Sequence, residues 1–200
     1  NTYPTHSLGP VAQWLGITRG DRFLRTTTFV TKSAARQEWA KSVLPKGHLD
    51  STREAWAHAA DSASTLIETE LGRVIVLRFD GTSPRPHNMV HYGLQGTGGA
   101  FVSQRHDSED PLVWLNGISP GVSPWNPGYT EMLRPDGYEG PRAEWQSLWE
   151  YSGEHEHPRW KARAREAMQA GHGGGDFFVI EDFADAIHKG VPPPIDVYDA

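Results

Sequence analysis

A tyrosine and a histidine lie three residues apart near the start of the sequence, as Tyr3 and His6 of the run YPTH. Both side chains can act as general acids or bases once their surroundings tune them. In a turn or a first helical turn this spacing can place both on one face, where a helix N-terminus adds positive potential. The pattern indicates a proton-transfer pair, and the alternative is an ordinary structural turn.

A second candidate is the glycine-rich run GHGGGD, from Gly171 to Asp176. Glycines allow the backbone to approach a ligand closely, and Asp176 is placed to cap the helix expected after it. The alternative is a simple turn that joins two helices. Without other information, the residue types alone do not separate a ligand-binding loop from such a turn.

Two further motifs fail on their chemistry. The run GISPG matches the nucleophile elbow of serine hydrolases, but Pro120 follows the serine and lacks the backbone N–H that an oxyanion requires. His155 and His157 stand two residues apart in a predicted loop, with no supporting carboxylate pattern. We therefore expect no serine hydrolase and no metal site, and we expect the two histidines to be structural or solvent-facing.

A third glycine-rich run, GTGG at Gly96 to Gly99, lies between two predicted strands. A dinucleotide-binding loop needs the spacing G-x-G-x-x-G between a strand and a helix, and this run has neither. We expect a hairpin turn here and no complete cofactor site in this chain.

The elements that must position these residues are mainly strands in the first two thirds of the chain and helices at its end. Strands are expected at 23–31, 64–70, 74–79, 88–94, 100–104 and 112–115. Helices are expected at 7–16, 33–44, 142–151, 159–170 and 176–189. Pro10 would lie in the first turn of its helix, while Trp39 and Leu44 would face inward. This order favours an α+β fold, with an antiparallel-rich open sheet and helices on one face.

Composition and charge exclude several classes of protein. The 200 residues include 19 Lys and Arg and 25 Asp and Glu, for a net charge of −6. Scattered cations without a basic face argue against nucleic-acid and anionic-membrane partners, and no apolar run approaches the roughly 20 residues that span a bilayer. The absence of cysteine excludes disulfides and thiolate ligands, and leaves export or a cytoplasmic location open.

Aromatic residues concentrate between residues 125 and 160. Their expected role is to pack irregular loops onto the fold. The alternative is a surface that contacts carbohydrate or another subunit, because flat amphipathic rings suit both.

Several long stretches, taken in order, resemble the C-terminal domain of glycoside hydrolase family 109, within the Gfo/Idh/MocA superfamily. They are NTYPTHSLGPVAQWLGITRGDR, TSPRP, GLQGTGGAF, EHPRWK and AGHGGGDFFVIEDFADAIHKGVPPPIDVYDA. The resemblance spans residues 1–200. It implies one substrate-binding and oligomerisation domain, with an N-terminal Rossmann domain that binds NAD missing from this chain.

The resemblance also implies a reaction. Such proteins resemble alpha-N-acetylgalactosaminidases that oxidise the sugar at C3, eliminate the C1 leaving group, add water and return the hydride. NAD would carry the hydride, while the protein would position the carbohydrate substrate and supply acid and base groups. The sheet implies a homo-oligomer through its open face.

Residue roles carry over by motif. Tyr3 and His6 match the tyrosine and histidine of YPTH and are the expected catalytic pair. Arg85 of SPRP would contact the substrate or stabilise its loop, and His172 of GHGG would lie on the substrate side. The sequence has His87 where relatives often carry an aromatic residue, at a position expected to bind substrate, and Gly175 where a methionine is common.

Two alternatives to the glycosidase remain. One is a sugar oxidoreductase of the same superfamily that releases reduced cofactor. The other is a stand-alone domain that binds sugar or mediates assembly without catalysis. The exact sugar and linkage, the hydrolase or dehydrogenase outcome and the oligomer size are open at this point.

Overall fold

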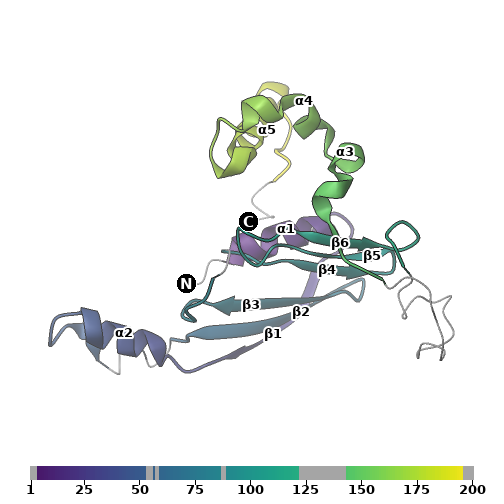
Figure 1. Ribbon diagram of the computed structural model, residues 1–200. Coiled ribbons are helices and arrows are strands. Elements are labelled where there is room, and N and C mark those ends of the chain that lie inside the picture. Colours follow the sequence, from purple (N-terminus) through teal and green to yellow (C-terminus); the bar gives the residue numbers. More distant parts are fainter. Residues whose placement is uncertain (1–3, 53–55, 57–58, 87–88, 122–142, 196–200) are drawn as a thin grey trace, which may run out of the picture. The chain divides into compact units, whose positions relative to one another are not determined.

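The chain divides into two compact units, and the computed structural model describes residues 4–52, 56, 59–86, 89–121 and 143–195. The first unit comprises Asn1–Arg85 and Val197–Ala200, and the second comprises Pro86–Asp196. Figure 1 labels the elements, and each unit is described by itself below.

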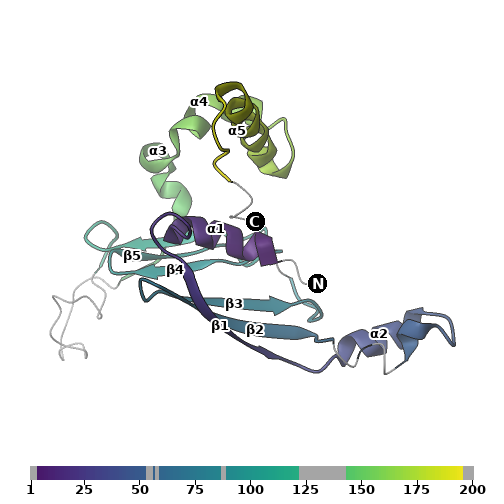
Figure 2. The same cartoon turned by 180° about the vertical axis from the view of Figure 1, so that it is seen from behind.

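The first unit is built on a three-stranded antiparallel sheet with strand order β1-β2-β3. Its elements are α1 (Pro4–Leu15), β1 (Phe23–Val30), α2 (Ala35–Val43), a short 3₁₀ turn η1 (Leu49–Ser51), β2 (Ser62–Thr69) and β3 (Val74–Asp80). Figure 2 shows the same strands from behind. The expected β2–β3 hairpin is confirmed, and Gly72 takes the left-handed φ of +76° in its turn.

The two faces of this sheet differ in burial. Because side chains alternate along a strand, the register places Ile67 of β2 opposite Ile75 of β3 on one face, and both are buried. Leu66 and Val76 pair on the other face and are exposed. All eight residues of β1 are exposed. Strands β2 and β3 therefore bury one face and leave the other open, whereas β1 is exposed on both faces.

Helix α1 starts earlier than predicted, at Pro4 rather than Ser7, so Pro10 lies inside the helix and not in its first turn. Proline has no N–H, so Pro10 cannot donate to the carbonyl one turn before it, at His6. The helix ends at Gly16, where φ is +67°. Beyond it, the buried Asp21 accepts a charged hydrogen bond from Arg73 at 3.0 Å, which ties this end to the β2–β3 hairpin.

Helix α2 is capped by a residue distant in the sequence. The Asp61 carboxylate accepts hydrogen bonds from the backbone amides of Ala34 and Ala35 at 2.7 and 2.8 Å. Trp39 is 59% exposed, so the expectation that it faces inward is wrong, and Ala40 is the buried residue of this helix. The small methyl group allows close packing that the indole ring would prevent.

The second unit contains a four-stranded antiparallel sheet with order β4-β5-β6-β7, followed by helices. The strands are β4 (Gly93–Gly96), β5 (Gly99–Val102), β6 (Leu112–Leu115) and β7 (Gln146–Ser147). The helices are η3 (Leu148–Tyr151), α3 (Ser152–His155), α4 (Pro158–Ala167), η4 (His172–Gly174) and α5 (Gly175–Lys189). The helix predicted over 142–151 is wrong at residues 143–147, and only the 3₁₀ turn η3 forms over Leu148–Tyr151. Gln146 and Ser147 instead pair with β6, and the Ser147 side chain caps the following 3₁₀ turn.

The predicted α+β class is confirmed, and the arrangement is consistent with a C-terminal domain of the Gfo/Idh/MocA kind. Every pairing between the named strands is antiparallel. The strands form two hydrogen-bonded sheets where the sequence suggested one. No helix in the described part of the chain is long and apolar enough to cross a membrane.

Candidate functional site

His6 lies in the first turn of α1, with its side chain exposed. Tyr3, its expected partner, lies outside the described residues. The first turn of α1 holds no acidic side chain, so no local carboxylate offsets the positive potential of the helix N-terminus.

Arg85 closes the loop that follows β3. Its Nη1 lies 2.9 Å from the Asp80 carboxylate and also donates to the Ser83 carbonyl at 3.3 Å. The Asp80 side chain is only 9% exposed, while that of Arg85 is 44% exposed. This ion pair supports the loop-stabilising alternative for Arg85. His87 lies outside the described residues.

The pKa of Asp80 is held well below its ordinary value. The largest cause is the hydrogen bond from the Ser83 hydroxyl at 2.8 Å. The backbone amides of Thr82 and Ser83 add two hydrogen bonds, burial opposes them, and Arg85 contributes a favourable charge. A carboxylate with so many donors is a fixed structural anion.

The run from Gly171 to Asp176 links α4 to α5 through three successive residues with positive φ. His172, Gly173 and Gly174 have φ of 51°, 61° and 94°. A left-handed conformation costs a non-glycine residue roughly 1–2 kcal/mol, so His172 is held there by its surroundings. Glycine is required at position 174, since a Cβ there would lie 2.8 Å from the Trp160 ring.

His172 forms a side-chain pair with Asp176. Its Nδ1 lies 2.8 Å from the Asp176 Oδ1, and the two side chains are 80% and 50% exposed. The expectation that Asp176 caps the helix is wrong. Gly174 is the N-cap of α5 and no side chain caps it, while Asp176 lies within the first turn and contacts the histidine.

A cluster of aromatic and charged side chains fixes this loop to the two helices. The rings of Trp160 and Phe178 meet edge to face at 4.8 Å, and the Arg159 guanidinium lies 4.8 Å from the Phe178 centroid. Arg159 also forms ion pairs with Glu181 at 2.7 Å and Asp182 at 2.8 Å. These contacts join α4 to α5 and so hold both ends of the loop that carries His172.

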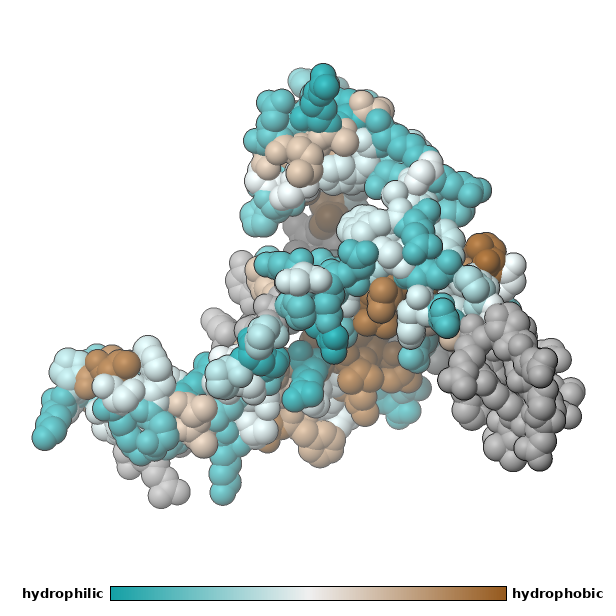
Figure 3. Space-filling model, viewed as in Figure 1, coloured by the Kyte–Doolittle hydropathy of each residue, from teal (hydrophilic) through white to brown (hydrophobic). Residues whose placement is uncertain are grey.

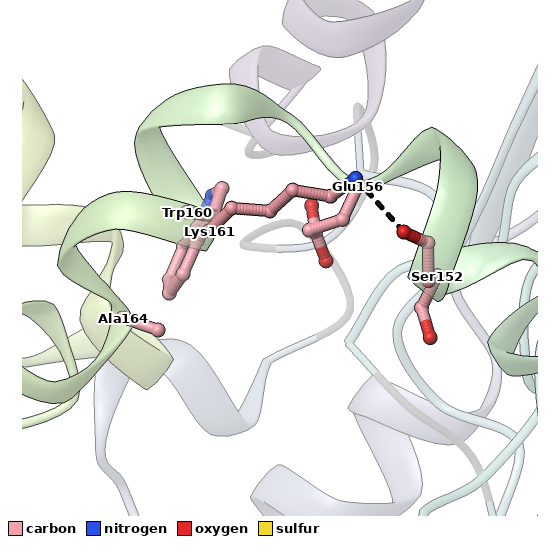
Figure 4. Close-up of a pocket in the computed structure, with 6 residues that line it drawn as sticks. Ser152, Glu156, Trp160, Lys161 and Ala164 are labelled. Atoms are coloured by element: carbon pink, nitrogen blue, oxygen red, sulfur yellow. Dashed lines mark hydrogen bonds between the residues drawn. The ribbon is translucent and has the colours of Figure 1, made fainter.

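A shallow depression of about 490 Å³ lies beside α3 and α4 (Figure 4). It is lined by Ser152, Gly153, Glu156, Trp160, Lys161 and Ala164. The Lys161 ammonium donates to the carbonyls of Gly153 and Glu154 at 2.9 and 3.1 Å. The lysine therefore links α3 to α4. The Trp160 ring packs against Phe178, as expected for an aromatic residue of this region, whereas Trp145 and Trp149 are 49% and 56% exposed.

The other motifs of the sequence have structural roles. Ser119 of GISPG is buried and accepts the Leu115 amide at 2.8 Å, and His157 accepts the Arg159 amide as the N-cap of α4. Gly96 and Gly99 pair at the end of the β4–β5 hairpin, so this glycine run is not a strand-to-helix phosphate loop. The described residues hold no group of three or more potential metal ligands.

The predicted residues fall into separate places: His6 and Arg85 in the first unit, His172 in the second. Sequence reasoning missed Asp176 as a partner of His172. The i, i+4 spacing of the two residues gave only a weak signal, because His172 precedes α5 and has a left-handed backbone, whereas the i, i+4 rule applies within a helix.

Comparisons with known proteins now identify the family. The family model described as "Glycosyl hydrolase 109, C-terminal domain" matches residues 1–200. A glycosyl hydrolase family 109 protein of Stenotrophomonas maltophilia is 34% identical over 200 residues, covering 99% of this chain and 37% of the relative. One of Solibacter usitatus is 32% identical over 201 residues, covering 100% of this chain and 39% of the relative.

A protein of Shewanella oneidensis named alpha-N-acetylgalactosaminidase is 30% identical over 200 residues, covering 100% of this chain and 38% of the relative. The chain thus spans less than two fifths of the length of these three curated relatives. It belongs to glycosyl hydrolase family 109, as the C-terminal domain.

Proposed function

We propose that this domain forms the substrate-side wall of an NAD-dependent glycosidase that acts on alpha-N-acetylgalactosaminides. The observation that carries the proposal is the family match over the whole chain, together with the Shewanella oneidensis relative that bears that name. The exposed polar groups on α1 and on the loop before α5 are the chemistry that this domain offers to a sugar.

Proton transfer is the part of the reaction assigned to this chain. Tyr3 and His6 would move protons to and from the sugar around C2 and C3, with His6 in the first turn of α1. Unlike ordinary glycosidases, this chemistry requires no pair of carboxylates flanking the bond that breaks. His172, Arg85 and His87 would contact the substrate.

NAD would supply reversible hydride transfer at the sugar when bound. The glycine run at β4–β5 lies in a hairpin, so it does not provide the strand-to-helix turn that a dinucleotide-binding loop needs. We expect the intact protein to hold NAD through residues outside this chain. Calorimetric titration of NAD into this 200-residue chain should show weak or no binding; a micromolar constant would contradict this expectation.

The decisive experiment replaces the proton-transfer pair in the intact protein. Removal of a positioned acid or base typically lowers the rate by about 10²–10⁴. Tyr3→Phe and His6→Ala should each lower turnover of an alpha-N-acetylgalactosaminide by that order, with little change in thermal midpoint. A structural role predicts the reverse, which is a lower midpoint with near-parental turnover of the folded fraction. Net reduction of NAD during turnover would favour the sugar oxidoreductase instead.

A second proposal concerns assembly, and it rests on the open face of the first sheet. Phe29, Leu66, Val74 and Val76 lie on this face by register and are 72%, 49%, 65% and 70% exposed. Figure 3 shows hydrophobic residues over this sheet. The same face also carries Arg25, Glu68 and Arg78, so its apolar part centres on Leu66, Val74 and Val76. Exposed apolar patches mark interaction sites. We propose that a second copy of the chain covers the face.

Light scattering tests the assembly. The parent should form an oligomer, and Val76→Lys should shift it toward the monomer because a charge would be buried in the contact. Val43→Lys is the matched control, since Val43 is 54% exposed on α2, away from the sheet face. A parent that is monomeric at all concentrations would contradict the proposal.

A further inference from the structure

We infer that Asp176 is a positioning residue that orients the His172 imidazole toward the substrate. The inference rests on the proposed function, which places His172 on the substrate side, and it adds to that proposal the group that holds the ring. It also explains why the residue that precedes the histidine, Gly171, is a glycine.

The contact itself has the geometry of an orienting hydrogen bond. The Asp176 Oδ1 lies 2.8 Å from Nδ1 of His172, which leaves Nε2 at the far side of the ring, outside this bond. A carboxylate at Nδ1 accepts from the Nδ1–H tautomer and leaves Nε2 with its lone pair. In that tautomer Nε2 is the atom that can accept a proton or a hydrogen bond from a sugar hydroxyl.

Gly171 provides the space that this arrangement requires. Its φ is −68°, a conformation that any residue adopts, so backbone freedom does not explain a glycine here. A Cβ at this position would lie 2.4 Å from the Asp176 Oδ2, well inside van der Waals contact. A side chain at position 171 would therefore push the carboxylate away from the histidine, and glycine keeps it in place.

The backbone of the loop fixes the position of His172, the partner of Asp176. His172 keeps a left-handed φ of 51° between glycines, and Gly174 packs against Trp160 and the backbone of Ala167. A histidine on a flexible loop would adopt a common backbone conformation. Here the packed loop sets the direction of the Cα–Cβ bond, and Asp176 fixes the remaining rotation of the ring.

The alternative is a surface ion pair without function. Exposed pairs of this kind contribute little, and both side chains are largely open to solvent. Such a pair would explain the distance, but it gives no reason for the glycine at 171. The two explanations differ in what happens when the carboxylate loses its charge or is displaced while the histidine is kept.

The experiment uses the intact protein with Asp176→Asn, Gly171→Ala and Gly175→Ala. The first keeps the shape but allows an amide to donate to Nδ1, and the second displaces the carboxylate without changing either partner. Gly175→Ala is the matched control, because Gly175 has helical φ of −60° and its added Cβ meets nothing within 4 Å. The readouts are kcat and KM on a chromogenic alpha-N-acetylgalactosaminide, thermal midpoint, and ¹⁵N NMR of the His172 ring.

We expect Asp176→Asn and Gly171→Ala to lower kcat/KM by roughly 10- to 100-fold, the range found when the hydrogen-bond partner of a metal-ligating histidine is removed. The NMR signals should report loss of the single Nδ1–H tautomer in both, while Gly175→Ala behaves as the parent. Parental kcat/KM and parental ring signals in Asp176→Asn would overturn the inference. A lower midpoint with unchanged ring signals would also overturn it, as a purely structural role.

Failure of the proposed function has a separate signature. If the parent cleaves no alpha-N-acetylgalactosaminide, the substrate assignment is wrong, and the ring measurement decides the inference alone. A changed tautomer in Asp176→Asn then supports Asp176 as the positioning residue, and an unchanged one overturns it.

Discussion

The loop after β3 and the loop before α5 each pair a carboxylate with a basic side chain, but they expose these pairs very differently. Asp80 is 9% exposed and receives hydrogen bonds from two amides, a hydroxyl and Arg85. Asp176 and His172 are 50% and 80% exposed. The same two types of group therefore hold a loop together in one unit and lie open to solvent in the other.

The backbone explains the difference. Asp80 ends a strand, and the chain turns back over its carboxylate, so neighbouring amides reach it within three residues. Around the Asp176–His172 pair, the backbone amides of Gly174 and Asp176 instead donate to the Gly171 carbonyl. Residue type alone does not distinguish a structural from an accessible carboxylate, whereas the number of donors around it does.

The largest effect should follow from a side chain at Gly174. Gly174→Ala would place a Cβ 2.8 Å from the Trp160 ring and 3.0 Å from the backbone of Ala167, at φ of +94°. Strain and overpacking together should lower the free energy of unfolding by about 2–5 kcal/mol. Urea denaturation measures this, and a loss below that of Gly171→Ala would show that the loop is less tightly packed than described.

The next effect concerns the accessible pair. His172→Ala should lower kcat/KM on an alpha-N-acetylgalactosaminide by roughly 10- to 100-fold, the loss of one strong hydrogen bond to substrate. The thermal midpoint should change little, because the side chain is largely exposed. Parental kcat/KM in His172→Ala would contradict a substrate-binding role for the accessible pair.

The buried pair should respond to pH instead. The lowered pKa of Asp80 means that its carboxylate stabilises the folded state fully above its ordinary pKa of 3.8. This contribution is lost as the pH falls from 3.8 toward the folded-state pKa. Asp80→Ala should lower the thermal midpoint by several degrees at pH 7, and the gap to the parent should narrow below pH 3.8. A gap that is constant with pH would contradict the assignment.

The smallest effect should come from Gly175. Its helical conformation and open surroundings suit a larger residue, and replacement of glycine within a helix typically gains about 0.5–1 kcal/mol. Gly175→Ala should therefore raise the free energy of unfolding slightly. A loss of stability would indicate that a neighbour occupies this space.

Much of the fold was predictable from local patterns. β1, β3, α4 and α5 follow from β-branched runs or from helical periodicity with a clear stop, such as the left-handed Gly190 after α5. The strand β7 was not predictable, and a helix was expected over 142–151 in its place. Pairing of β7 with β6, across more than 30 residues, overrides the local helical preference there.

The site was predictable only in part. Motifs indicated His6 and His172, but only the folded loop reveals that Arg85 pairs with a buried Asp80 carboxylate. Trp39 shows the same limit, since a large apolar ring in a helix is expected to face inward and here lies exposed. Burial depends on which surfaces meet, and that information is spread over the whole chain.

The capping of α2 by Asp61 bears on the order in which the first unit folds. A helix of nine residues with no local cap is marginal by itself in water. Its carboxylate partner lies next to the start of β2, and β2 must pair with β1 to bring the two together. We therefore expect α2 to form late, after strand pairing, so that substitutions within it mainly accelerate unfolding and leave the folding rate nearly unchanged.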